Sequence, residues 1–280
     1  MIASQTPVGH APRPEVSVFG KKQTAGGALS NPRSEGTFHL GRGLGTFAFQ
    51  ADPNYRAELE KLGFRLVGNK QELEYFMADV SLDFARAVRD ANLRASNEEL
   101  LEMRIHGLSK EYIAEMRASG YTDLRARDYI DLKIHGVQPQ FVRELKAAGY
   151  ELSAQKIVEL KIHGVSRDYI QALNSYGLKP RAEDIVQLRI HGVSPEYLKG
   201  LHDAGFQDLN SERIVQMKIH GVSTDFVQKT YELGYRFRPE EITEMRIHGV
   251  DTAYLRKLKD AGFQNLTAEK IVQLKVHGVD

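Results

Sequence analysis

From Asp52 onward the sequence repeats itself with a period of 28 or 29 residues. A short motif, Ile/Val-His-Gly-Val/Leu, recurs once per period, and a degenerate copy, Ala78-Asp79-Val80, stands 28 residues before the first full one. A fixed period of this length is the signature of a stacked array of supersecondary units, and it constrains the fold more than any other signal in the chain. The histidines of the motif are His106, His135, His163, His191, His220, His248 and His277.

Each period predicts two short helices separated by a tight turn. In SPEYLKGLHDAGF, Ser194 is an N-cap and Gly205 supplies a left-handed stop. The second helix is expected from about Asn210 to His220 with a stop at Gly221, so the helices should be about 10–11 residues long. The N-cap recurs as Asp52, Ser81, Ser109, Gln138, Ser166, Ser194, Ser223 and Asp251. The stop after the first helix recurs as Gly63, Asn92, Gly120, Gly149, Gly177, Gly205, Gly234 and Gly262.

These units predict an all-α fold, a solenoid of about eight helical hairpins over residues 52–280, in the terms of stacked repeats. Helices this short are marginal alone, so neighbouring pairs must stabilise one another by covering each other's apolar flanks. The handedness of the superhelix, right or left, stays open.

Residues 1–51 differ from the repeats. Residues 1–35 carry too few apolar side chains to offset the entropy of ordering, which predicts a flexible tail. In 36–51 apolar residues alternate with small or polar ones, which predicts a β-hairpin cap, with the glycine-rich stretch 41–45 interpreted as its turn.

Composition excludes several classes of function. The formal net charge is only +1, which argues against a strong polyanion-binding field, and the absence of cysteine excludes thiol catalysis and cysteine-ligated zinc. No apolar run is long enough for a membrane span and no signal segment is evident, so the location stays open, with the cytoplasm as the default. No catalytic motif is present, so neither an enzyme nor a cofactor is expected; the one enzymatic alternative is a site around His39, Arg42 and Asp52.

Stacking turns each repeat position into a column of side chains. The aromatic columns are interpreted as core, with stacking platforms for bases or sugars as the alternative. They are Tyr55, Phe84, Tyr112, Phe141, Tyr169, Tyr197, Phe226 and Tyr254, and then Phe64, Tyr121, Tyr150, Phe206, Tyr235 and Phe263.

The histidine column is interpreted as structural. Neighbouring histidines, about 9–10 Å apart, cannot share a metal ion, and no HxxxH pair is present. Each histidine instead follows an acceptor by four residues, as His248 follows Glu244, and can bond to it on the same helix face. A contact with a ligand is the alternative.

A basic column lies two residues before each motif histidine. The helical wheel places Lys161 about 40° from Ile157, inside the apolar arc, where an unpaired charge would be costly. The cations therefore either reach helix-end carbonyls and acidic neighbours, or line a groove that binds an anion. They are Arg104, Lys133, Lys161, Arg189, Lys218, Arg246 and Lys275.

The outward positions of the first helices do not repeat, which suits a surface that reads a partner. They include Lys110-Glu111, Pro139-Gln140, Arg167-Asp168, Pro195-Glu196 and Thr224-Asp225.

The units LKIHGVSRDYI and LRIHGVSPEYL, with LGTFAFQADPNYRAELEKLGF before them, resemble helical-hairpin repeats found beyond the peptidase part of bacterial antibiotic-sensor-type membrane metallopeptidases and in related proteins. The resemblance covers about residues 36–280 and implies an accessory region in an exported setting. The HExxH motif of the peptidase part is missing here, so the resemblance implies no catalysis.

The favoured hypothesis is a non-catalytic scaffold that binds a protein or peptide, and the runner-up is a nucleic-acid or polyanion binder that uses the basic column. The last second helix keeps the apolar residues of interior copies, so its flank is expected to be open and to be covered by self-association or by further sequence. The residues of this association flank are Ile271, Val272, Leu274 and Val276.

Overall fold

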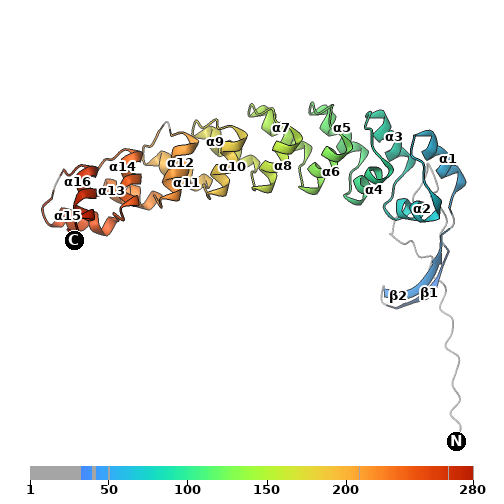
Figure 1. Cartoon of the computed structure of the whole chain (residues 1–280), viewed down its shortest axis with the longest axis horizontal. Coiled ribbons are helices and arrows are strands. Elements are labelled where there is room, and N and C mark those ends of the chain that lie inside the picture. Colours follow the sequence, from blue (N-terminus) through green and yellow to red (C-terminus); the bar gives the residue numbers. More distant parts are fainter. Residues whose placement is uncertain (1–32, 40–41, 50, 208, 264, 280) are drawn as a thin grey trace, which may run out of the picture. The chain divides into compact units, whose positions relative to one another are not determined.

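The structure is a computed structural model that describes residues 33–39, 42–49, 51–207, 209–263 and 265–279. Two strands and sixteen helices follow one another in these ranges (Figure 1). The strands are β1 (Arg33–His39) and β2 (Arg42–Ala48). The first helices of the hairpins are α1 (Pro53–Lys61), α3 (Leu82–Asp90), α5 (Lys110–Ala118), α7 (Pro139–Ala147), α9 (Arg167–Ser175), α11 (Pro195–Asp203), α13 (Thr224–Glu232) and α15 (Thr252–Asp260). The second helices are α2 (Gly68–Met77), α4 (Asn97–Ile105), α6 (Ala126–Ile134), α8 (Ala154–Ile162), α10 (Ala182–Ile190), α12 (Ser211–Ile219), α14 (Pro239–Ile247) and α16 (Ala268–Val276).

The predicted α-solenoid is confirmed. The chain divides into two compact units, one formed by the residues up to Ala114 with Arg125–Tyr129, the other by Glu115–Leu124 with Ile130–Asp280. In the second unit, α7, α9, α11, α13 and α15 pack in sequence as one layer, and α8, α10, α12, α14 and α16 pack in sequence as another. In the first unit α1 packs on α3. From α7 to α16, every second helix is therefore a neighbour in space, as a stack of hairpins requires.

The N-cap residues and left-handed stops predicted from sequence begin and end the helices in the structure. Ser194 accepts a hydrogen bond from the Tyr197 N–H at 3.2 Å, and Gly205 has a φ of +83°. Asn92 and Asp79, which replace glycine in two turns, both adopt a φ of +57°. All the helices except α2 have nine residues, fewer than expected, because the N-cap and the C-cap lie outside the hydrogen-bonded segment.

The β-hairpin differs in its bounds from the prediction. β1 and β2 pair antiparallel, with His39 opposite Arg42 and Gly36 opposite Gly45. The pairing begins at Arg33, three residues before the expected start, while residues 1–32 of the predicted tail lie outside the described residues. Interpreting the whole glycine-rich stretch as a turn was wrong, because residues 42–45 belong to β2, where glycines face each other across the pair.

The aromatic columns form the core. All eight first-helix aromatics are buried, from Tyr55 to Tyr254. In the second column Phe64, Phe206 and Tyr235 are buried, Tyr121 and Tyr150 are half-buried, and Phe263 in the last hairpin is 42% exposed. Within the part of the chain that the structure describes, no helix is long and apolar enough to cross a membrane.

Candidate functional site: an exposed isoleucine ridge

The basic column lies between the two helices of each hairpin. Lys218 Nζ is 4.4 Å from the centroid of the Tyr197 ring, and Lys161 Nζ is 4.6 Å from that of Phe141. The same placement, at 4.5–5.2 Å, recurs for Lys275 over Tyr254, Arg189 over Tyr169, Arg246 over Phe226 and Arg104 over Phe84. Lys133, like the other six, is half-buried.

The arginines of this column also reach back to the end of the preceding hairpin. Arg189 Nε donates to the carbonyl of His163 at 3.2 Å, and Arg246 Nε donates to that of Gly221 at 3.1 Å. Arg104 does the same with Asp79 O at 3.0 Å in the first unit. Because the carbonyls at a helix C-terminus carry a partial negative charge, these cations cap the helix that precedes them in the stack. Their charged groups are thus engaged within the fold.

The histidine column occupies the C-caps of the second helices. Each of its seven backbone N–H groups donates to the carbonyl four residues earlier, at 3.0–3.1 Å, and closes the last turn. The side chains are half-buried or exposed. The predicted bond to the upstream acceptor is present at His248, whose Nε2 lies 2.9 Å from Glu244 Oε1, while His106 Nε2 lies 4.0 Å from Glu102 Oε1. Among the described residues no three histidine or acidic side chains are grouped so as to hold a metal ion.

The most regular exposed feature is the residue just before each histidine. In the five second helices that lie wholly within the second unit these side chains are aliphatic and each is between 49% and 61% exposed, although interior aliphatic residues of the same helices are buried or half-buried. They form one row because α8, α10, α12, α14 and α16 pack in sequence. We call this row the isoleucine ridge, which consists of Ile162, Ile190, Ile219, Ile247 and Val276.

The two sides of the ridge differ in chemistry. On one side, four residues before each ridge residue, stand Val158, Val186, Val215, Thr243 and Val272, which are buried or half-buried. On the other side, the second and sixth positions of the five helices fall within about 60° of the ridge on the helical wheel. These ten positions hold six glutamates and four glutamines, with no cation. They are Gln155, Glu159, Glu183, Gln187, Glu212, Gln216, Glu240, Glu244, Glu269 and Gln273.

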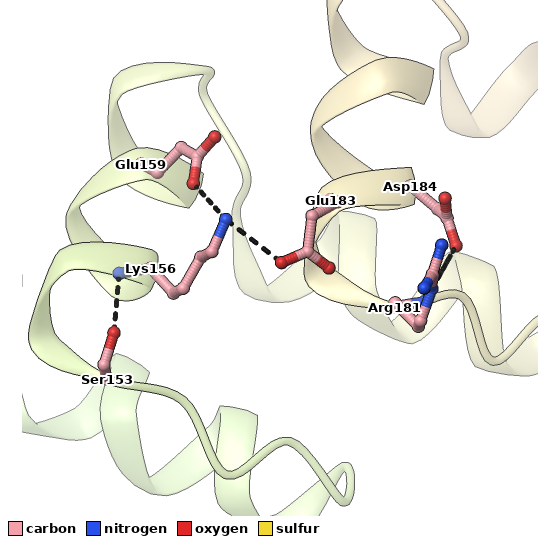
Figure 2. Close-up of polar contacts among 6 residues, drawn as sticks. All are labelled: Ser153, Lys156, Glu159, Arg181, Glu183 and Asp184. Atoms are coloured by element: carbon pink, nitrogen blue, oxygen red, sulfur yellow. Dashed lines mark hydrogen bonds and ion pairs between the residues drawn. The ribbon is translucent and has the colours of Figure 1, made fainter.

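Ion pairs along this face join successive second helices. Lys156 Nζ on α8 lies 2.9 Å from Glu159 Oε2 on its own helix and 3.0 Å from Glu183 Oε1 on α10 (Figure 2). The hydrogen bond from its own backbone N–H, and then the bond to Lys156, lower the pKa of Glu183. Arg213 on α12 pairs with Glu240 on α14 in the same way. The face is therefore held in register by cations at the third position of alternate helices.

The ridge did not emerge from the sequence analysis, although a signal for it exists. Ile162 lies about 140° from the buried Ile157 on the wheel, well outside the apolar arc. A position at this angle that is aliphatic in every copy departs from the pattern of a solvated helix face.

The expected association flank is only partly open. Ile271 is fully buried, and Val272 and Leu274 are half-buried. Val276 is exposed, but as the last member of the ridge, not as part of the flank. Phe263 and Val279, by contrast, are about 40% exposed, whereas their counterparts in the preceding hairpin, Tyr235 and Val250, are buried.

The remaining positions singled out from sequence are dispersed. Of the outward first-helix pairs, Gln140, Asp168 and Glu196 are exposed, but Pro139 is buried. Around the proposed enzymatic site, His39 and Arg42 are partners in the strand register, and the Asp52 carboxylate accepts a hydrogen bond from the Asn54 N–H at 2.8 Å as the N-cap of α1.

No known protein-family model matches the chain, and no curated protein is significantly similar to it.

Proposed function

We propose that the chain is a non-catalytic repeat scaffold that binds a protein or peptide through the isoleucine ridge. The observation that carries the proposal is the ridge itself, five aliphatic side chains about half exposed, one on each of five successive second helices. Isolated exposed apolar residues are ordinary on protein surfaces, whereas a contiguous apolar row rimmed by polar groups is typical of an interaction site. A stack of repeats presents such a row as an extended surface.

The basic column supports the alternative, a polyanion binder, less well. To bind phosphates its cations would have to leave the aromatic rings and the carbonyls that they contact, as Arg246 does with Phe226 and Gly221. The face beside the ridge carries glutamates, which repel a phosphate backbone. Titration with single-stranded and duplex nucleic acid at about 50 mM and about 200 mM salt tests this alternative, since phosphate contacts weaken steeply with salt.

The exposed Phe263 and Val279 support self-association as a second property of the chain. In interior hairpins the corresponding side chains are covered by the following hairpin, for example Phe206, whose ring packs edge-on against Tyr231 with centroids 6.1 Å apart. A second copy that covers the last hairpin would bury these groups in the same way.

The test of ridge-mediated binding is selection from a displayed library of random peptides, followed by affinity measurement on the full chain. Peptides enriched on the wild-type chain should lose roughly 30-fold or more in affinity for the triple variant Ile190→Ser/Ile219→Ser/Ile247→Ser, because each substitution removes apolar contact area. The matched control is Gln171→Ser/Asn174→Ser/Gln228→Ser, which changes exposed side chains of the first-helix layer. Enriched peptides that bind the ridge variant as well as the wild type would refute the proposal.

A further inference from the structure

We infer that the partner docks on the isoleucine ridge as a basic amphipathic α-helix that lies along the stacking direction of α8, α10, α12, α14 and α16. This inference rests on the proposed function and names the chemistry of its ligand. Three properties of the face carry it: the asymmetry of the two sides of the ridge, the spacing of the ridge residues, and the distribution of charge.

The asymmetry suits a ligand with one apolar and one charged face. At the fifth helix position the half-buried Val158 and Val272 border the ridge on one side and extend its apolar surface. Exposed glutamates and glutamines border it on the other. An amphipathic helix matches both, because its apolar stripe and its charged face lie side by side.

The spacing of the ridge fits the pitch of a helix. Neighbouring helices in a packed layer lie about 8–10 Å apart, so successive ridge residues recur at about that distance. Residues seven apart in an α-helix are separated by about 10.5 Å along the axis and lie on nearly the same face. A helix with apolar residues at heptad spacing can therefore meet one ridge residue with every two turns, and about 29 residues would span the five.

An extended polyproline ligand is the weaker match. Its three-residue turn also repeats at about 9 Å, but such ligands dock in grooves lined by aromatic rings. On the described second helices of this layer the side chains that border the ridge on its two sides are aliphatic, hydroxyl, acidic or amide. The ridge presents exposed aliphatic side chains, which suit packing against the apolar face of a helix.

The charge of the face selects a basic partner. The ten positions beside the ridge hold six glutamates and no cation. Lys156 and Arg213 neutralise some of them through Glu159, Glu183 and Glu240. Glu212, Glu244 and Glu269 make no ion pair with another helix in the part of the chain that the structure describes. Lysines or arginines flanking the apolar stripe of the partner would face these three carboxylates.

The experiment uses three designed peptides of about 29 residues with leucine at the same heptad positions and lysine, glutamate or glutamine elsewhere, plus a scrambled lysine peptide without a stripe. Fluorescence anisotropy with the full chain at about 150 mM salt should rank the lysine peptide tightest, at least tenfold above the other three. The variant Glu212→Gln/Glu244→Gln/Glu269→Gln should weaken the lysine peptide by about tenfold and flatten its salt dependence. The variant Ile190→Ser/Ile219→Ser/Ile247→Ser should weaken it by about 30-fold or more.

The outcomes separate this inference from the proposed function. If the glutamate or scrambled peptide binds as tightly as the lysine peptide, or if the charge variant changes nothing, the basic helix is refuted while ridge binding stands on the library selection. If library peptides also ignore the ridge variant, both fail. Should the triple ridge variant lose helical content, the single variant Ile219→Ser and a photo-crosslinker at position 219 supply the measurement. Crosslinking of the lysine peptide at position 219, but not at position 228 of the first-helix layer, supports the inference, and equal crosslinking at both overturns it.

Discussion

At the scale of single residues, the identity of one aromatic side chain follows the length of its hairpin. Hairpins that span 29 residues between successive N-cap positions have tyrosine in the first helix, as at Tyr197 and Tyr254, whereas 28-residue hairpins have phenylalanine in three cases of four. The Tyr197 hydroxyl donates to the Val222 carbonyl at 2.8 Å, and the Tyr254 hydroxyl donates to Val279 O at 2.7 Å. The longer hairpin thus brings a backbone carbonyl at its end within hydrogen-bonding distance of the tyrosine hydroxyl.

Tyr169 is the exception, a tyrosine in a 28-residue hairpin. Its hydroxyl is buried without a hydrogen-bond partner among the described residues, and burial raises its pKa to about 12. We predict that Tyr169→Phe leaves stability unchanged or raises it slightly, because no bond is lost. Tyr197→Phe should cost about 1 kcal/mol, because it leaves the Val222 carbonyl unpaired. Urea unfolding of the two variants checks the difference. Equal losses in the free energy of unfolding would contradict the view that only the 29-residue hairpins give the tyrosine hydroxyl a carbonyl partner.

The Lys156 cluster predicts a pH dependence. Hydrogen bonds to Glu159 and then to Glu183 raise the pKa of Lys156, and the pKa of Glu183 is lowered. A carboxyl whose pKa is lower in the folded state stabilises the fold above its unfolded pKa, and this contribution is lost as the pH falls through the folded value. Glu183→Gln should therefore reduce the loss of stability between about pH 5 and pH 3, measured by thermal melts across pH, with Glu212→Gln as the control.

At the scale of elements, neighbouring repeats are joined by hydrogen bonds from cationic side chains to the carbonyls at the ends of helices. Cations at the eighth helix position reach the carbonyl end of the preceding helix in both layers, as Arg246 reaches Gly221 among the second helices and Lys259 reaches Leu233 O at 2.9 Å among the first. Arg89 makes the same contact with Leu62 and Gly63 in the first unit. The first-helix layer shares this pattern only in part, since Asn174, His202 and Tyr231 hold the eighth position of α9, α11 and α13.

Removing one such cation should loosen its junction. Arg246 donates to Gly221 O and to Val250 O, at 3.1 and 3.0 Å, and lies over Phe226. We predict that Arg246→Met costs about 1–3 kcal/mol, since charge-assisted hydrogen bonds are lost while the apolar stem is kept. Chemical denaturation checks this, with the exposed Arg256→Met as the control. Equal stability of the two variants would show that the cation is not needed at the junction.

Close packing of α11 on α13 gives a second prediction at this scale. A Cβ atom on Gly200 would stand 2.8 Å from Thr224 Cβ, too near for either helix to keep its place. Alanine is the better helix former by about 1 kcal/mol, but overpacking costs about 1–3 kcal/mol, so Gly200→Ala should be destabilising on balance. Lys257→Ala, at the equivalent position of α15, should be neutral in the same melts, and Thr224→Gly should partly rescue the Gly200 variant.

The elements were predictable from sequence because their signals are local. Ser194 and Gly205 fix the ends of a helix through their own chemistry, and Asn92 does so without glycine. The role of Lys161 was left open because the atoms that it meets belong to a neighbouring helix. The ridge was missed for a related reason: the exposure of Ile162 is a property of the stack, and a single helix does not define which apolar positions the neighbours leave uncovered.

At the scale of the whole molecule, the two ends of the repeat array differ in their fitness for stacking. The last hairpin leaves Phe263 and Val279 about 40% exposed. The first hairpin carries Glu60 at the position that Arg89 and Lys259 hold in α3 and α15, and Phe76 at the position of the basic column. A carboxylate facing helix-end carbonyls is repelled, so the first hairpin of one copy is poorly suited to cover the last hairpin of another.

Self-association should therefore bring the last hairpins of two copies together. We predict that the mass measured by light scattering rises with protein concentration and that Leu274→Glu reverses this rise, because it places a charge on the half-buried flank. The wild-type association should stop at a dimer, since contacts between like ends close on themselves. A monomer at all concentrations, with α16 ordered by hydrogen exchange, would refute the prediction, whereas growth into long filaments would indicate head-to-tail stacking instead.

Because the capping cations contact helices that precede them in the chain, the hairpins become stabilised in a fixed order during synthesis. Arg246 completes the end of α12, and Lys259 completes the end of α13, so these helix termini are completed by residues that lie about 26 positions later in the chain. During synthesis, which runs from the N-terminus, a newly emerged hairpin would be held only by the hairpin before it until its successor follows. The most recently synthesised hairpin would be the least stable, and each new hairpin would stabilise the hairpin that precedes it in the chain.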